Sequence, residues 1–142
     1  MELTNFTIYG QYIGLEWPNG YADLHNNFNF VRLVYQLQPQ MRLLLEWQKP
    51  SGSQAAELPY QKLRLVFEGV AYLKINERDP DYPFLEDEIL AHLSRTPPEA
   101  RDEFENIYFN EDAQAHYDLT MCFQNGWGIK VNADTVRLEL ES

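Results

Sequence analysis

The sequence predicts an α+β, mainly β fold: an antiparallel sandwich or strongly bent sheet of about 7–8 strands, with one or two short helices inserted between residues 83 and 104. Three observations predict it. Apolar and polar residues alternate in several runs, which is typical of half-buried strands. Aromatic residues make up 14% of the chain and favour strands. Four-residue apolar spacing is confined to one stretch, so we expect no strand–helix alternation of the doubly wound kind.

The first half of the chain predicts a weak strand followed by a hairpin. Residues 6–13 form the weaker first strand. Apolar residues alternate over residues 31–37 and again over 41–47. Pro39 lies between these two runs and suits a turn, because its φ angle is preset. The stretch of residues 50–59 predicts a loop from its prolines, serines and glycine.

One long strand is predicted over residues 63–75. Every odd position from Leu63 to Ile75 is apolar or glycine, which is the two-residue period of a strand. This run is long for a single strand. Gly69 is therefore the expected bulge or bend, because an interior glycine weakens a strand.

The acidic segment, defined as residues 77–118, is the only part predicted to be helical. Leu85, Ile89 and Leu93 recur at four-residue spacing, and Pro83 followed by acidic residues suits a helix start. Residues 96–99 (Thr-Pro-Pro-Glu) match a capping box, which predicts a second short helix through about Phe104. The chain is expected to return to strand at residues 107–109.

Three alternating runs predict three C-terminal strands, over residues 117–123, 127–131 and 136–140. The turn between the first two decides their register. An Asn-Gly pair usually signals a two-residue loop, but that register would pair Phe123 with Gly128 and put the two apolar sets on opposite faces. A three-residue loop pairs Phe123 with Trp127 and places Gly126 at the left-handed position. We predict the second register.

Length and composition predict one soluble, cytoplasmic domain spanning residues 1–142. The single cysteine, Cys122, allows no intramolecular disulfide, which fits a reducing compartment. The first residues have neither the basic start nor the apolar run of a signal peptide. No stretch approaches the ~18 apolar residues of a membrane span.

The negative charge is concentrated in the acidic segment. Between Glu77 and Asp118 there are thirteen acidic and three basic residues, a net charge of −10, whereas the whole chain carries −11. Such a segment attracts a basic partner and repels nucleic acid and anionic lipid. Nucleic-acid binding also needs a basic patch, and the basic residues of the strands are balanced by nearby acids. The sequence therefore predicts a basic protein partner, no nucleic acid and no membrane, and leaves the oligomeric state open.

Catalytic and metal motifs are weak. Cys122 and His116 share a strand and an expected outward parity, but six residues of strand span about 20 Å, too far for proton transfer. His25 and His92 could approach Cys122 only through tertiary folding. The carboxylates of residues 79–88 lack calcium-loop spacing, and the histidines and cysteine lack zinc spacing. Glu46 and Glu68 are polar positions on strands, but nothing in the sequence indicates a glycosidase pair. We predict no catalytic residue, no metal and no cofactor.

Residues 24–27 (Leu-His-Asn-Asn), 65–70 and 129–136 follow a layout that resembles small β-rich bacterial domains grouped with immunity proteins of polymorphic toxin systems. In that family a His-Asp pair often opens the second strand, where this chain has His25-Asn26. The resemblance implies a non-catalytic protein that binds and blocks a cognate toxin, often a basic nuclease or another secreted effector.

The predicted partner-binding residues combine carboxylates with aromatic anchors. They are Glu86, Asp87, Glu88, Asp102, Glu103 and Glu105, with Tyr82 and Tyr108. The alternative function is a small-ligand-binding protein or enzyme on a curved sheet, with Trp17, Trp47, Trp127 and the tyrosines lining a pocket that contains His25 or Glu46. A third possibility is an assembly module that self-associates through sheet edges.

Overall fold

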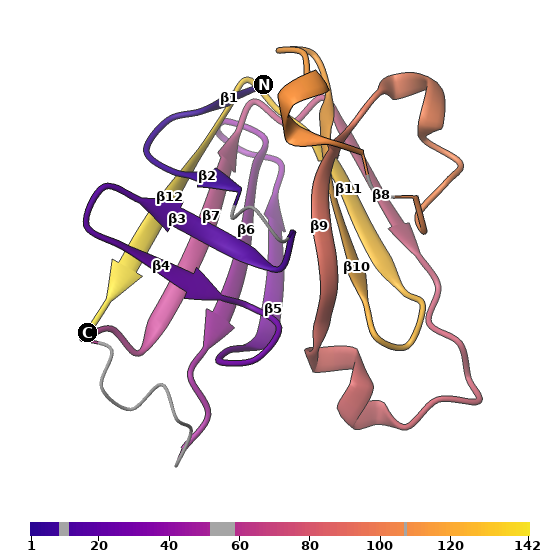
Figure 1. The fold of residues 1–142 in the computed structure, drawn as a ribbon. Helices are drawn as coiled ribbons and strands as arrows, with labels where there is room; N and C mark the ends of the chain where they lie inside the picture. Colours follow the sequence, from indigo (N-terminus) through magenta and orange to yellow (C-terminus); the bar gives the residue numbers. More distant parts are fainter. Residues whose placement is uncertain (9–11, 52–58, 107) are drawn as a thin grey trace.

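The computed structural model describes residues 1–8, 12–51, 59–106 and 108–142. Over these ranges the chain forms twelve strands and three short 3₁₀ helices (Figure 1). The strands are β1 (Glu2–Leu3), β2 (Thr7–Ile8), β3 (Gly14–Trp17), β4 (Gly20–Asp23), β5 (Asn29–Gln36), β6 (Arg42–Gln48), β7 (Lys62–Glu68), β8 (Tyr72–Asn76), β9 (Leu90–Thr96), β10 (Asp118–Phe123), β11 (Gly128–Asn132) and β12 (Thr135–Glu141). The 3₁₀ helices are η2 (Phe84–Glu88), η3 (Pro98–Ala100) and η4 (Asn110–Asp112).

The strands form three sheets. The largest has the order β1-β12-β7-β6-β5, the second has the order β8-β11-β10-β9, and the third has the order β2-β3-β4. All pairs are antiparallel except β1 with β12. The fold is therefore mainly β, as predicted, but the described strands outnumber the seven or eight expected.

One apolar core joins the three sheets. Leu45 of β6, Met121 of β10 and Leu15 of β3 are all fully buried in the same cluster. Phe30 contacts both Trp47 and Phe123, with ring centroids 5.1 Å apart in each pair. Burial of these side chains is the main favourable term holding the sheets together, at roughly 25 cal/mol per Å² of apolar surface.

The C-terminal hairpin has the predicted register. Met121 pairs with Ile129 and Leu119 with Val131, and the Phe123 amide donates to the Trp127 carbonyl at 2.9 Å. Gly126 has φ +86°, the left-handed conformation that glycine adopts at no steric cost. The hairpin of β5 and β6 around Pro39 is also confirmed.

The long strand predicted over residues 63–75 is wrong in one respect: it is two strands in different sheets. β7 pairs with β6 and β12, whereas β8 pairs with β11. The chain changes sheet just after Gly69, which has φ +71°. A Cβ at Gly69 would lie 2.2 Å from the Asp134 carboxylate, so only glycine fits this crossing.

The helix predicted from the spacing of Leu85, Ile89 and Leu93 is present only as the short 3₁₀ helix η2, which begins after Pro83; its extension to Leu93 is wrong. Residues 90–96 form strand β9, and the chain before it makes only the single 3₁₀ helix η2, where Leu85 is 76% exposed. The pairing of β9 with β10 shifts between Cys122 and Phe123. This bulge adds one residue to β9 and changes its parity, so that Leu90 and Leu93 both face the core. Of the apolar residues in this stretch, Leu90 and Leu93 therefore owe their common face to an irregular strand and not to a helix.

The other local predictions have mixed outcomes. Thr96 does not cap a helix; its hydroxyl lies 2.7 Å from the Thr120 hydroxyl, and η3 is a single turn that follows Pro97. Tyr108 and Phe109 are not in a strand, and Ile107 lies outside the described residues, as do residues 9–11 of the first predicted strand and 52–58 of the predicted loop. No helix in the described part of the chain is long and apolar enough to cross a membrane.

Candidate functional site

The sheet of β8, β11, β10 and β9 has one apolar and one polar face. Its apolar face belongs to the core. The register places the following residues on the other face: Tyr72, Lys74, Asn76, His92, Ser94, Thr96, Asp118, Thr120, Cys122, Gly128, Lys130 and Asn132. Several of them are nevertheless buried, with Lys130, Asp118 and Ser94 at 0% exposure. Burying so many polar groups requires a cover that supplies hydrogen bonds.

That cover is residues 97–106, which we call the strap. The Phe104 ring lies on Gly128, where its Cδ1 is 2.5 Å from the position of a Cβ. The Lys130 ammonium donates to the Ala100 carbonyl at 2.7 Å and lies 5.1 Å from the Phe104 ring centroid. Burial lowers the pKa of Lys130, while Asp118 opposes that shift. The strap is therefore fixed by one aromatic ring and one buried cation.

A second cation fixes the start of the strap. The Arg101 guanidinium donates twice to the Asp118 carboxylate, through Nε and Nη2, both at 2.9 Å. These bonds raise the pKa of Arg101. Asn132 donates to the same carboxylate at 2.8 Å, and the guanidinium carbon is 3.8 Å from the Tyr72 ring centroid. Such a bidentate pair gives geometric precision as well as energy.

Cys122 and His92 are direct cross-strand neighbours on this face. This corrects the expectation that Cys122 points outward on a strand shared with His116: Cys122 is 8% exposed, and His116 precedes β10. The Cys122 thiol donates to the Phe104 carbonyl, and burial raises its pKa to about 12. Burial also lowers the pKa of His92, whose Nε2 is buried without a hydrogen-bond partner. Both shifts favour the neutral forms, so the pair is not an activated nucleophile.

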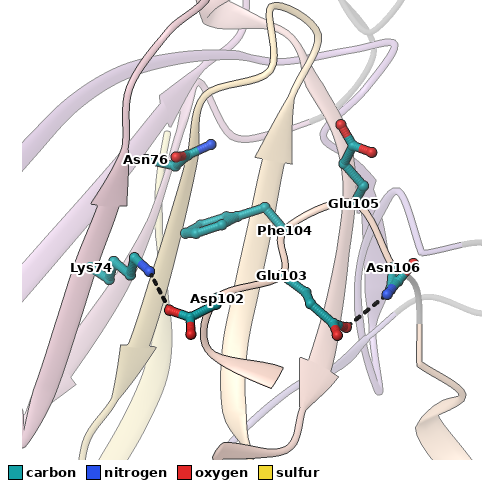
Figure 2. A pocket seen from close by; sticks show the side chains of 7 residues that line it. All are labelled: Lys74, Asn76, Asp102, Glu103, Phe104, Glu105 and Asn106. Atoms are coloured by element: carbon teal, nitrogen blue, oxygen red, sulfur yellow. Dashed lines mark hydrogen bonds and ion pairs between the residues drawn. The ribbon is translucent and has the colours of Figure 1, made fainter. Parts of the chain in front are cut away.

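Two hollows flank the strap at Phe104 and Glu105, which line both. The first, of about 340 Å³, is shown in Figure 2, where the Phe104 ring lies between Lys74 and Asn76. The second, of about 320 Å³, brings Asp79 and Tyr82 to the other side of the strap. Asp79 and Glu105, which are far apart in the acidic segment, therefore line the same hollow.

The structure places five of the predicted partner-binding residues on or beside the strap: Asp102, Glu103, Glu105, Tyr82 and Tyr108. Glu105 is exposed. Glu103 accepts hydrogen bonds from Asn106 at 2.7 Å and from Tyr108 at 3.2 Å. Asp102 is paired with Lys74 at 3.2 Å, although its side chain is 100% exposed (Figure 2). Tyr82 lines the second hollow.

The three predicted carboxylates of η2 do not line either hollow among the described residues. Asp87 is structural: Arg78 pairs with it at 3.0 Å, Asn125 donates to it, and the Trp127 indole donates to its backbone carbonyl. Glu86 is half-buried and Glu88 is exposed. In the described ranges no cation forms an ion pair with Glu86, Glu88, Glu103 or Glu105.

Trp17, named for the alternative function, lines a hollow of about 590 Å³ together with residues 3–7, but three other residues named for that function serve other roles. Trp47 is fully buried in the core, and the His25 Nδ1 atom contacts the Leu90 carbonyl at 2.6 Å. Glu46 is 4% exposed between Arg32 and Arg64. No three His, Cys, Asp or Glu residues among those described are arranged to hold a metal.

Sequence reasoning missed the strap, Phe104 and the Cys122–His92 pair, because each depends on strand register rather than on local pattern. Comparisons with protein-family models, with curated proteins and with solved structures found no match. The geometry and charge of the site are therefore the basis for its function.

Proposed function

We propose that this chain is a non-catalytic, acidic protein-binding module, and that its partner is a basic protein of the kind that immunity proteins neutralise. The binding surface comprises the strap and the neighbouring residues 79–88. The resemblance of the sequence to immunity proteins of polymorphic toxin systems supports the same class of function. We infer that the two larger sheets form a sandwich that acts as a rigid body beneath this surface.

One observation carries the proposal: large apolar side chains are exposed among the carboxylates. Tyr82 is 49% exposed, Phe84 78%, Leu85 76% and Phe109 61%. The acidic segment therefore does not use these rings to cover the core. Exposed aromatic residues beside complementary charge are typical anchors of protein interfaces.

Charge supports the choice of a basic partner. The net charge of −10 already includes the three arginines of the segment. Among the described residues, Lys74 is the one cation from outside the segment that forms an ion pair with a carboxylate of it, that of Asp102. η2, β9 and η3 of this segment lie on the side of the molecule formed by the second sheet, whereas η4 lies near the N-terminus (Figure 1). A field of this kind can raise association rates by about 10- to 1,000-fold at low salt.

The state of Cys122 supports a non-catalytic role. A nucleophilic cysteine needs a lowered pKa and access to substrate. Here the pKa of the thiol is raised to about 12, and the strap covers it.

The experiment compares two variants with the same change in charge. Glu103→Lys/Glu105→Lys reverses two carboxylates at the first hollow, whereas Glu2→Lys/Glu16→Lys reverses two exposed carboxylates on β1 and β3. Proteins captured by the wild type from cells that produce this chain are identified and purified whatever their charge, and their association and dissociation rates are measured at several salt concentrations.

We expect the strap variant to lose at least about tenfold in association rate at low salt, and the control variant to lose much less. The association rate of the strap variant should depend less on salt concentration than that of the wild type. The control variant should keep the salt dependence of the wild type. Equal losses in the two variants would mean that net charge, rather than this surface, governs binding. A captured partner with an acidic surface would contradict the proposal.

A further inference from the structure

Arg95 of β9 is a buried cation that pairs with no carboxylate of the described residues. It is 7% exposed, and the register of β9 places it opposite Leu119, toward the interior. Its Nη2 atom donates to four backbone carbonyls, those of Tyr117 at 3.0 Å, Met1 at 3.2 Å, Ala115 at 3.4 Å and Gln114 at 3.5 Å. Two hydrogens on Nη2 serve four acceptors, so these bonds are shared and long.

One further nitrogen of the guanidinium, Nε, is left unsatisfied. Nε is buried and has no hydrogen-bond partner, and the described residues place no carboxylate within ion-pair distance of Arg95. Burial lowers the pKa of Arg95, which the more distant Asp118 opposes. An unpaired charge in such a position is costly, and natural proteins usually supply a partner.

A cavity of about 370 Å³ adjoins Arg95. Its other walls come from β1, β2 and the turn before β10, and they are mostly apolar, with Leu3, Phe6, Ile8 and Ala113 among them. A mostly apolar cavity with a few charged or polar groups is the usual form of a small-molecule site. Here these groups are Arg95, Thr7 and Met1, whose N-terminal ammonium donates to the Ala115 carbonyl. The cavity shares no lining residue with the two hollows at the strap, so it is independent of the proposed docking surface.

We propose that this cavity binds a small monocarboxylate with an apolar tail. The carboxylate would pair with the part of the Arg95 guanidinium that lines the cavity, while the tail would contact Leu3, Phe6 and Ile8. A carboxylate is favoured because guanidinium and carboxylate form charge-assisted hydrogen bonds. A phosphate is disfavoured because three or four charged oxygens would be left against apolar walls.

The test uses octanoate as the probe, with 1-octanol and octylammonium as ligands of similar tail length and different charge. Binding is measured by calorimetry and by amide chemical shifts of residues around the cavity. We expect saturable 1:1 binding of octanoate, about tenfold or more weaker binding of octanol, and no binding of octylammonium. Equal affinity for octanoate and octanol would overturn the role of Arg95.

Variants distinguish the cavity from the rest of the surface. Ala113→Phe fills the cavity and leaves Arg95 in place, whereas Ala115→Phe adds the same ring on an exposed side chain of the same turn. Octanoate affinity should fall at least about tenfold in the first variant and stay unchanged in the second. If octanoate does not bind the wild-type protein at millimolar concentration, Arg95 is a clip between β9 and the neighbouring carbonyls, and the proposal is wrong.

Discussion

The Phe104 ring lies where a side chain on Gly128 would be. A Cβ atom on Gly128 would lie 2.5 Å from Cδ1 of Phe104 and 2.9 Å from the carbonyl oxygen of Met121. Gly128 is buried at the start of β11. The missing side chain lets the ring rest directly on the sheet, which in turn positions the carboxylates on either side of Phe104.

Gly128→Ala should displace the strap. The ring must lift because the Met121 backbone cannot move away from the new methyl group, and overpacking of this kind costs about 1–3 kcal/mol. Urea unfolding measures the loss. The cost should be smaller when Gly128→Ala is made in a Phe104→Ala background, since the two residues are in contact. Additive effects would mean that the ring does not rest on Gly128.

Cys122 should react slowly in the folded protein. Its pKa is raised from 9.0 to about 12, so about 1,000-fold less thiolate is present at pH 8 than in the unfolded chain. Labelling by a chromogenic disulfide, followed with and without urea, measures the ratio, and the chain contains no other cysteine. Phe104→Ala should accelerate labelling of the folded protein. Similar rates in both states would contradict the burial of the thiol.

His92 should make stability fall as the pH is lowered below about 6.5. Its pKa is lowered by burial in the folded state from the ordinary value of 6.5. Between the lowered pKa of the folded state and 6.5, the unfolded chain binds more protons than the folded chain, so lowering the pH favours unfolding. Above pH 6.5 His92 is neutral in both states and adds no pH dependence to the free energy of unfolding. Urea midpoints between pH 5 and 7.5 should decline less steeply for His92→Gln. His116→Gln, at an exposed position, should retain the wild-type slope.

Glu46→Gln should destabilise the largest sheet. The carboxylate is 4% exposed and lies 2.6 Å from the Arg64 Nε atom and 3.4 Å from that of Arg32. Its loss leaves both guanidinium groups without this partner and should cost about 1–3 kcal/mol. Glu141→Gln is the matched control: that carboxylate also pairs with Arg64, but its side chain is 47% exposed, so the cost should be about 0–1 kcal/mol. Equal shifts in thermal unfolding would show that burial of Glu46 adds nothing.

Most strands could be predicted because their signals are local. The C-terminal runs alternate residue by residue. The pairing of Phe123 with Trp127 could be predicted because only that register places the apolar residues of both strands on the same face of the sheet. Strand β9 could not be predicted, because its bulge depends on its pairing with β10. The acidic residues of the candidate site could be identified from the sequence. The sequence did not show that Asp87 forms an ion pair with Arg78 whereas Glu105 forms none with the described residues.

The sequence alone determined the β content, the turn at Gly126 and the concentration of carboxylates in one segment, since these depend on neighbouring residues and on composition. Tertiary structure decided which polar groups are hidden. Lys130, Asp118 and Cys122 alternate with apolar residues as surface positions would, yet the strap buries them. The physical reason is that burial depends on what packs against a strand face, and that contact comes from a segment distant in the chain.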